Sequence, residues 1–234
     1  MTTADLRHLL DRFSSRSPSR GDDGDNAFRT GLPAIDRLMP KHGLSRAAVH
    51  ELLMPLNLPM PRAFALLLAR SAMKQGAIVW CDPQRTLYPP AVRNGGIPLE
   101  RLILLRPRND AEAIWAVAEC LRCRGVDAII AAPARLTQVE ARRLQLAAEA
   151  GGGAGILIRP QGRASTHYAA ATRWLVTPAP GKPSVQRWKI QLLHGHGGRV
   201  GESVLLEVNR ETHHVRASEA LADRPPAAKA SRAS

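Results

Sequence analysis

Cysteines, aromatic residues and long apolar runs are scarce in this 234-residue sequence, and each scarcity excludes a class of protein. The three cysteines, Cys81, Cys120 and Cys123, cannot form a disulfide framework and suit a reducing cytoplasm. Aromatic residues make up 4% of the chain, which is too little for a platform that stacks single-stranded bases. Apolar runs are shorter than a transmembrane helix, and residues 1–11 lack the apolar core of a signal peptide. We therefore expect a cytoplasmic protein that has no membrane partner.

Acidic side chains are also in deficit, with 20 against 33 basic ones and a formal net charge of +13. Five of the basic residues are lysine and the rest are arginine, whose planar fork binds phosphate and carboxylate well. This balance favours nucleic acid or an acidic protein as partner. Hydrophobic residues at 44% and charged residues at 23% are typical of globular proteins, so the length predicts about one domain.

Composition divides the chain into three parts. We expect an N-terminal arm and flexible linker at 1–27, a folded domain at 28–215 and a disordered basic tail at 216–234. The arm has apolar residues three and four positions apart, which predicts a short amphipathic helix. These residues are Leu6, Leu9, Leu10 and Phe13. The helix either docks in a groove of a partner or packs on the chain's own domain.

The folded part alternates predicted strands with predicted helices. Strands are expected at 47–53, 77–82, 101–105, 126–132 and 156–158, and helices at 62–75, 110–124 and from 137 to the glycines at 151–153. This alternation is typical of an open, mostly parallel α/β sheet with helices on both faces. Period-two segments at 172–177, 185–193 and 202–208 predict antiparallel strands added at the C-terminal edge of that sheet.

The turn after the first strand of such a sheet usually binds phosphate, using glycines, a lysine and a hydroxyl group. In this chain the turn has Met54, Pro59, Met60 and Pro61 at these places, and each proline lacks an amide donor. The residues predict neither a catalytic group nor a metal site. We interpret Asp82, directly after a strand, as a structural cap. Likewise, Cys120 and Cys123 are interpreted as helix residues, and His194 and His196 as loop residues.

Basic residues gather in the last part of the predicted domain, around strand ends. They are Arg159, Arg163, Arg173, Arg187 and Lys189. Two interpretations are open: one electropositive rim that contacts DNA or a partner, or ordinary solvated surface. Any DNA binding by such a rim is expected to be sequence-independent and steeply dependent on salt.

The order of motifs across residues 29–208 resembles the core of the RecA recombinase family, beginning with Thr30-Gly31-Leu32. The resemblance implies a RecA-like fold. Where that family has its ATP-binding glycines, lysine and threonine, this chain has the Met54 to Pro61 turn. Gln84 stands in place of the catalytic glutamate, and Ala132 in place of the Mg²⁺-binding aspartate. The resemblance therefore implies a pseudo-ATPase without a cofactor. Gln161 matches the RecA glutamine that senses nucleotide and begins a DNA-contacting loop.

Among degenerate RecA relatives, residues 50–69, 136–137 and 155–160 are most similar to the ImuA family, which in turn resembles the SulA cell-division inhibitors. An ImuA resemblance implies a non-catalytic accessory subunit of an error-prone translesion synthesis complex in the SOS response. The implied partners are an ImuB-like Y-family polymerase homologue, an error-prone C-family DNA polymerase and RecA. The alternative is a SulA-like inhibitor that binds the division GTPase FtsZ. The segments around Thr30 and after residue 170 extend beyond what a SulA chain requires, which favours ImuA.

Overall fold

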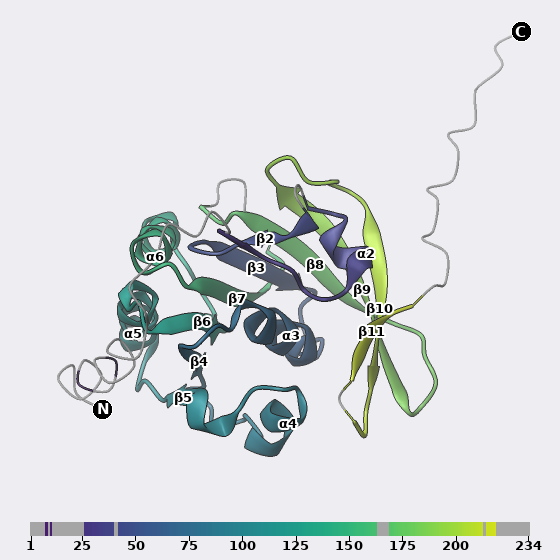
Figure 1. Cartoon of the computed structure of the whole chain (residues 1–234), viewed down its shortest axis with the longest axis horizontal. Helices are drawn as coiled ribbons and strands as arrows, with labels where there is room; N and C mark the ends of the chain where they lie inside the picture. The colour runs from purple at the N-terminus through teal and green to yellow at the C-terminus, as the bar shows by residue number, and fades with distance from the viewer. Residues whose placement is uncertain are drawn as a thin grey trace, which may run out of the picture.

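The computed structural model describes residues 26–39, 42–162, 169–212 and 214–218, together with His8 and Leu10. Strands form at β1 (Ala27–Phe28), β2 (Leu44–Ser45), β3 (Val49–Met54), β4 (Ala77–Cys81), β5 (Leu102–Leu105), β6 (Val126–Ala131), β7 (Ala154–Pro160), β8 (Thr172–Ala179), β9 (Val185–Gly195), β10 (Ser203–Asn209) and β11 (Val215–Ala217). The helices are α2 (Pro33–Asp36), α3 (Arg62–Ala72), α4 (Pro89–Asn94), α5 (Asp110–Arg122) and α6 (Gln138–Gly151), with a 3-10 turn at Leu99–Arg101. Figure 1 shows the sheet with helices on both of its faces.

The large sheet has nine strands in the order β11-β10-β9-β8-β3-β7-β6-β4-β5. From β8 to β5 all neighbouring strands are parallel, and β9, β10 and β11 continue the sheet with antiparallel pairs. This confirms a mostly parallel sheet with an antiparallel extension. The prediction for 172–177 was wrong in one respect, because β8 pairs in parallel with β3 and only its other edge is antiparallel, to β9. Period-two alternation is the same in both kinds of pair, so it cannot distinguish them.

Local hydrogen bonds explain where the helices begin and end. Helix α6 begins where it was expected, with a capping box of Thr137 and Glu140 in which the Thr137 amide donates to the Glu140 carboxylate at 2.8 Å. Helix α5 begins at Asp110 as expected, and the side chain of its cap, Asn109, accepts the Glu112 amide. Helix α3 ends at Ala72, three residues earlier than predicted. The Asp127 carboxylate accepts the amides of Lys74 and Gly76 at 2.6 and 2.8 Å, which holds this segment outside the helix.

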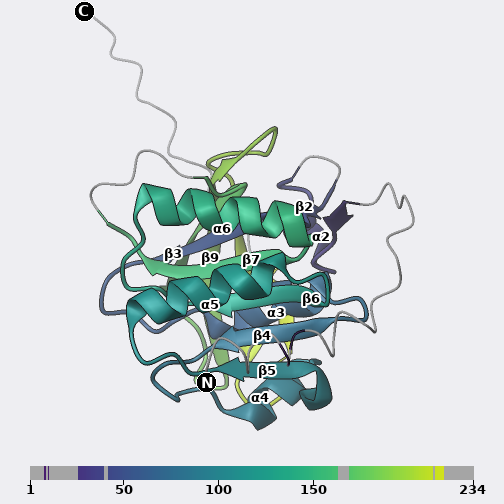
Figure 2. The ribbon, with the colours of Figure 1, turned by 90° about the vertical axis from the view of Figure 1, so that its left-hand side faces the viewer.

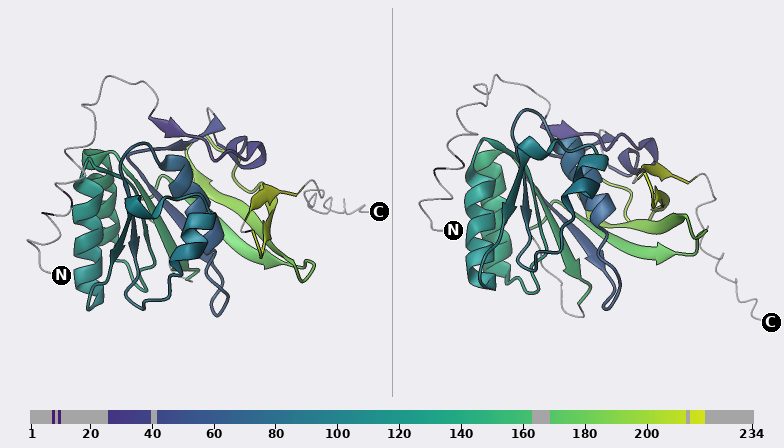
Figure 3. Two further views of the ribbon diagram at one scale, coloured as in Figure 1. Left: turned by 60° about the horizontal axis from the view of Figure 1, so that its bottom comes forward. Right: turned by 90° about the horizontal axis from the view of Figure 1, so that it is seen from below.

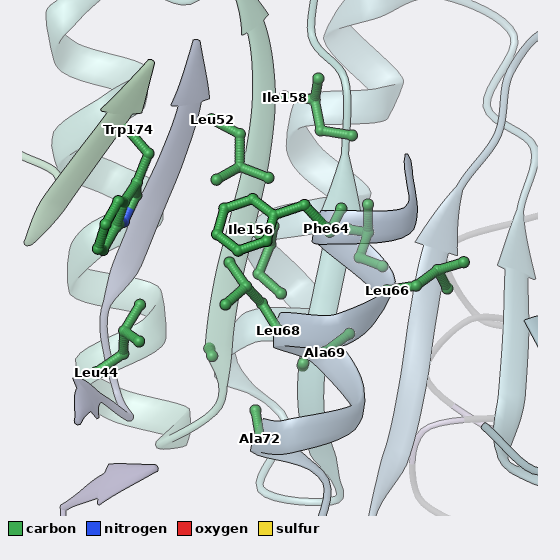
Figure 4. Close-up of a cluster of buried hydrophobic side chains, with 14 of the residues drawn as sticks. Leu44, Leu52, Phe64, Leu66, Leu68, Ala69, Ala72, Ile156, Ile158 and Trp174 are labelled. Carbon is green, nitrogen blue, oxygen red and sulfur yellow. The ribbon is translucent and has the colours of Figure 1, made fainter. Parts of the chain in front are cut away.

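Two hydrophobic layers lie on opposite faces of the sheet. Helices α5 and α6 lie side by side over one face, as Figure 2 shows. On the other face α3 inserts Phe64 and Leu68 toward Leu52 and Ile156 (Figure 4). Trp174 of β8 is fully buried in this second layer, and its ring meets Phe64 edge-on with the centroids 6.4 Å apart. Helices on both faces are therefore confirmed.

The antiparallel extension wraps around the side of the sheet on which α3 lies (Figure 3). Its inner face contributes Trp188, Ile190, Leu206 and Val208 to the same layer as α3. The alternate positions on β9 and β10 carry charged side chains instead, including Arg187, Lys189 and Glu207. Because side chains alternate across a strand, these charges share the outer face of the extension.

Leu10 is one of the two described residues of the predicted arm. Its side chain is 5% exposed and belongs to the layer under α5 and α6, and its carbonyl oxygen accepts the Cys123 thiol at 3.7 Å. At this residue the chain packs on its own domain, which was one of the two alternatives. The rest of the arm, most of the linker and the tail after residue 218 lie outside the described residues, so the three-part division stays a prediction. Within the described ranges, the helices are too short or too polar to cross a membrane.

Candidate functional site at the carboxyl edge of the sheet

The β3–α3 loop, residues 55–61, occupies the place where a parallel sheet usually binds phosphate. Asn57 turns the loop in the left-handed region with φ of 64°, and Leu56 next to it is 67% exposed. Arg62, the first residue of α3, donates to the Thr86 hydroxyl at 2.8 Å. The Met54 carbonyl accepts the amide of Gln161 at 2.7 Å, which joins the loop to the end of β7. The loop thus presents an apolar tip instead of a ring of amide donors.

Asp82 follows β4 at the same edge and acts as a structural cap. It is 4% exposed, and its carboxylate accepts the amides of Thr86 and Leu87 at 2.9 and 3.0 Å. These bonds close the loop that carries the exposed side chain of Gln84. The interpretation of Asp82 is confirmed, since its carboxylate is used within its own loop.

Exposed apolar side chains follow three of the parallel strands. Leu56 after β3, Tyr88 after β4 and Val139 after β6 are 67%, 66% and 79% exposed. The carboxyl ends of parallel strands meet at one edge of the sheet, so these three side chains, which we call the apolar edge, share that edge. Exposed apolar surface with a polar surround is typical of protein interaction sites.

Glu51, in the middle of the sheet on β3, is held by two of the predicted rim arginines. Its carboxylate accepts Arg159 from β7 at 2.8 Å and Arg173 from β8 at 3.0 Å. The Glu51 side chain is 1% exposed and the two arginine side chains are 13% and 14% exposed. We call these three residues the Glu51 cluster. Its ionic groups are desolvated and depend on one another.

A second carboxylate on β10 repeats this arrangement in the extension. Glu207 accepts Arg187 from β9 at 2.6 Å and Arg216 from β11 at 2.7 Å. We call these three residues the Glu207 cluster. The hydrogen bonds from Arg216 and then Arg187 lower the pKa of the Glu207 carboxyl from its ordinary value. Lys189, two residues along β9, is exposed and makes no hydrogen bond or ion pair with residues that the structure describes.

The structure divides the predicted rim into two groups. Arg159 and Arg173 meet at Glu51, and Gln161 is exposed just beyond Arg159. Arg187 lies opposite Ala179, six residues along β8 from Arg173, which corresponds to about 20 Å along a strand. Lys189 lies between them, opposite Thr177. Arg163 falls outside the described residues.

The cysteines and histidines form no metal site among the described residues, where His, Cys, Asp and Glu side chains do not gather in groups of three. Cys120 lies in α5 and Cys123 at its end. Burial, aided by the charge of Asp82, raises the pKa of the Cys81 thiol to about 12, so this thiol stays protonated at neutral pH.

The sequence analysis did not identify Glu51 or Glu207 as functional residues. A signal was present, because each is a carboxylate in a strand rich in apolar residues. Apart from His50, the other residues of the strand that contains Glu51 are apolar, and all of them except the partly buried Met54 are buried. A carboxylate in such a strand needs a cationic partner, because a buried unpaired charge is strongly unfavourable. The sequence could therefore have predicted that some of the arginines neutralise buried glutamates.

Together these features define an α/β protein with a mostly parallel sheet whose β3–α3 loop exposes an apolar side chain. Residues 47–155 match the family model described as cell division inhibitor SulA. Protein ImuA from Caulobacter vibrioides (strain NA1000 / CB15N) is 33% identical over 222 residues, covering 85% of this chain and 91% of that protein. Cell division inhibitor SulA from Pectobacterium carotovorum subsp. carotovorum (strain PC1) is 30% identical over 92 residues, covering 39% of this chain and 55% of that protein. The chain belongs to the ImuA family.

Proposed function

We propose that this protein is a non-catalytic accessory subunit of an error-prone translesion DNA synthesis complex in SOS mutagenesis. In this role it bridges an ImuB-like Y-family polymerase homologue, an error-prone C-family polymerase and RecA in the cytoplasm. Membership of the ImuA family supports the role, and the match to ImuA spans most of both chains. The single observation that carries the proposal is the β3–α3 loop, whose exposed Leu56 suits contact with protein and not with phosphate.

The fold is proposed to be a RecA-like ATPase core that has lost the residues for binding and hydrolysing ATP. Three prolines in the loop remove amide donors, and neither a lysine nor a hydroxyl group is present to hold phosphates and Mg²⁺. Gln84 is exposed at the place of the catalytic glutamate, and Ala132 packs against the apolar layer where an aspartate would bind Mg²⁺. Each replacement removes a different part of phosphoryl-transfer chemistry, so together they support a pseudo-ATPase.

A direct binding measurement tests whether the β3–α3 loop has lost the ability to bind a nucleotide. We expect no binding of a fluorescent ATP analogue that depends on residues 54–62, with or without Mg²⁺, and no phosphate release above that of buffer. Saturable binding that disappears when residues 54–62 are replaced by a Gly-Ser segment would contradict the pseudo-ATPase proposal. A change at Asp82 is unsuitable for this test, because its carboxylate holds the loop around Gln84.

Contact with protein at the apolar edge is tested by Leu56→Glu. The side chain is exposed, so the substitution should leave folding intact while placing a charge in the partner interface. We expect a deletion strain complemented with this variant to lose most ultraviolet-induced mutagenesis. Val200→Glu is the matched control, since Val200 is 58% exposed but lies in the β9–β10 connection. Equal mutation frequencies for the two variants would contradict a role for the apolar edge.

A SulA-like inhibitor of FtsZ is the alternative function, and the family match at residues 47–155 favours it. The two functions predict different phenotypes for the deletion strain. The translesion role predicts loss of damage-induced mutation with recombination largely retained. An unchanged mutation frequency, combined with loss of filamentation after damage, would support the FtsZ-binding role.

Direct contact with DNA is a further part of the proposal and concerns the predicted rim. Arg159 and Arg173 already hold Glu51, which leaves them partly neutralised. Non-specific phosphate contacts are therefore better supported at the outer face of the extension, where Lys189 is exposed.

A further inference from the structure

A cavity of about 710 Å³ opens at the amino end of β3, the opposite end from the β3–α3 loop. It lies between the β1–β2 pair, the C-terminal part of α3, the start of β8 and the end of β9. Figure 4 shows this end of β3 near Leu44, away from Ile158. The described lining comes from residues 26–29, 39, 43–46, 71, 171–172 and 194–196. Cavities of this size accommodate small organic ligands.

Positive and hydrogen-bonding groups dominate the polar part of this cavity. Arg29, Arg46, His194 and His196 line it, and the lining residues that the structure describes include no carboxylate. The exposed side chains of Arg29, His194 and His196 make no hydrogen bond or ion pair with residues that the structure describes. Three groups that can donate to an anion are thus available around one cavity, and the described part of its lining contains no acidic side chain.

The floor of the cavity is held in place by a buried network. The indole N–H of Trp174 donates to the Thr172 hydroxyl at 2.8 Å, and His50 Nδ1 lies 2.8 Å from that same hydroxyl. His50 Nε2 lies 2.8 Å from the Ser45 carbonyl, so Nε2 carries the hydrogen and Nδ1 accepts from Thr172. Because these hydrogen bonds hold Thr172 and Ser45 in fixed positions, the floor of the cavity is pre-organised, which favours binding of a defined ligand.

Arg46 is fixed in the wall by two further contacts. Its guanidinium donates to the Ala72 carbonyl at the end of α3 and lies 5.5 Å from the centroid of the Phe28 ring. These contacts fix the guanidinium of Arg46 at the cavity wall. The Arg46 side chain therefore loses its conformational entropy when the protein folds, and it loses little more when a ligand binds.

The cavity belongs to the parts of the chain outside the SulA-like region. The family match covers 47–155, and Ser71 is the one lining residue within it. The remaining lining residues come from 26–46 and 171–196. The segments that lengthen this chain relative to the SulA match are thus the ones that build the cavity.

We propose that this cavity binds a phosphomonoester group, carried by a nucleotide-sized ligand. A phosphomonoester has three terminal oxygens and close to two negative charges, so it can accept from a guanidinium and two imidazoles at once. A carboxylate, with two oxygens and one charge, would leave more of these donors unused. The group can come from a free mononucleotide or from the 5′ end of a DNA strand, and the experiment separates these sources.

The test uses the full chain and isothermal titration calorimetry with dAMP, deoxyadenosine and pyrophosphate. We expect saturable one-to-one binding of dAMP, competition by pyrophosphate and no binding of deoxyadenosine. Arg29→Gln and the double variant His194→Gln, His196→Gln should each weaken dAMP binding by about tenfold or more, because each loses charge-assisted hydrogen bonds. Arg142→Gln, an exposed arginine on α6, is the matched control and should bind dAMP like the parent chain.

A 5′-phosphorylated oligonucleotide and its 5′-hydroxyl counterpart identify the source of the phosphate. Displacement of dAMP by the phosphorylated strand alone assigns the site to a strand end, and displacement by neither strand assigns it to a free nucleotide. Equal displacement by both strands would overturn the proposal, as would equal binding of deoxyadenosine and dAMP or equal weakening by Arg142→Gln.

The chain itself supplies a rival anion, because Asp22, Asp23 and Asp25 directly precede Asn26 in the sequence. A variant with these three residues replaced by asparagine is therefore titrated in parallel. Absence of dAMP binding in both the parent chain and this variant would overturn the proposal, whereas binding by either chain that Arg29→Gln weakens would support it.

Discussion

Glu51 in the parallel part of the sheet and Glu207 in the antiparallel extension are each held by two arginines, but their surroundings differ. The arginines around Glu51 are 13% and 14% exposed, whereas those around Glu207 are 33% and 69% exposed. The Glu51 cluster therefore lies inside the protein, while Glu207 is covered mainly by the arginines themselves. The same charge arrangement thus has two physical meanings: one cluster is a buried structural unit, and the other is screened by water.

The comparison also separates the arginines by availability. An arginine of the Glu51 cluster must leave a buried carboxylate before it can contact a phosphate, which is strongly unfavourable. Cations on the outer face of the extension can contact a ligand at little cost to the fold. Charged side chains of the antiparallel extension can therefore change partners more easily than those of the Glu51 cluster. The following predictions test that distinction.

The largest effect is expected for Glu51→Gln. Removing the carboxylate leaves two largely buried guanidiniums without their negative partner, so the free energy of unfolding should fall by about 3 to 5 kcal/mol. Urea denaturation followed by circular dichroism measures the change. Arg142→Gln is a control for a general effect of charge, because it is exposed on α6. A loss below about 1 kcal/mol for Glu51→Gln would show that the cluster is screened like the one at Glu207.

The next effect concerns pH and the buried His50 beside Glu51. Burial lowers the pKa of His50 to about 4, and the hydrogen bond to Ser45 only partly offsets this shift. The unfolded chain takes up a proton below its ordinary value near 6.5, while the native chain does not until about pH 4. The contribution of neutral His50 to the free energy of unfolding is therefore fully present above pH 6.5 and falls by about 3 kcal/mol as the pH drops to 4.

His50→Asn tests this prediction, since asparagine does not titrate but can still accept from Thr172. We expect the slope of unfolding free energy against pH, measured by urea denaturation between pH 6.5 and 4.5, to decrease by about one proton. Glu207→Gln should change this slope much less, because an unfolded glutamate takes up its proton mainly near and below pH 4.5. An unchanged slope in the His50 variant would mean that the imidazole is protonated in the native state within this range.

A smaller effect is expected for Glu207→Gln. The two arginines lower the pKa of Glu207, so its contribution is present above the ordinary value near 4.5 and is lost as the pH falls through the lower native value. At pH 7 we expect a loss of less than about 1 kcal/mol, and 1 M salt should reduce it further. Chemical denaturation at two salt concentrations measures both. A salt-independent loss comparable to that of Glu51→Gln would contradict the difference between the clusters.

Elements with local signals were predictable from the sequence, and elements that depend on distant pairing were not. The capping box of Thr137 and Glu140 is complete within four residues, and it begins α6 as predicted. The parallel pairing of β8 with β3 brings together His50 and Thr172, which are 122 residues apart. An alternating pattern of apolar and polar residues does not show which distant strand is the partner. The short strands β1, β2 and β11 have too few residues to show a period.

The candidate sites follow the same division. The sequence grouped Arg159 with Arg173, but it could not show that both contact Glu51, which is 108 and 122 residues away. The composition of the β3–α3 loop was readable, because all of its residues are consecutive. The cationic cavity was not, since its lining comes from segments around 26–46, 71, 171–172 and 194–196 that only the folded chain brings together.

The smallest effect on stability is expected for Lys189→Gln, and this variant tests where DNA is contacted. The side chain is exposed, so the free energy of unfolding should change by less than about 0.5 kcal/mol. If the outer face of the extension contacts phosphates, the slope of log binding constant against log salt concentration for duplex DNA should decrease by about 0.9, because one contact is lost. Lys74→Gln, an exposed lysine directly after α3, is the matched control and should keep the parent slope. Fluorescence anisotropy over a salt series measures both variants. Equal changes for the two lysines would show that binding responds to total charge and not to the surface that Lys189 shares with the Glu207 cluster.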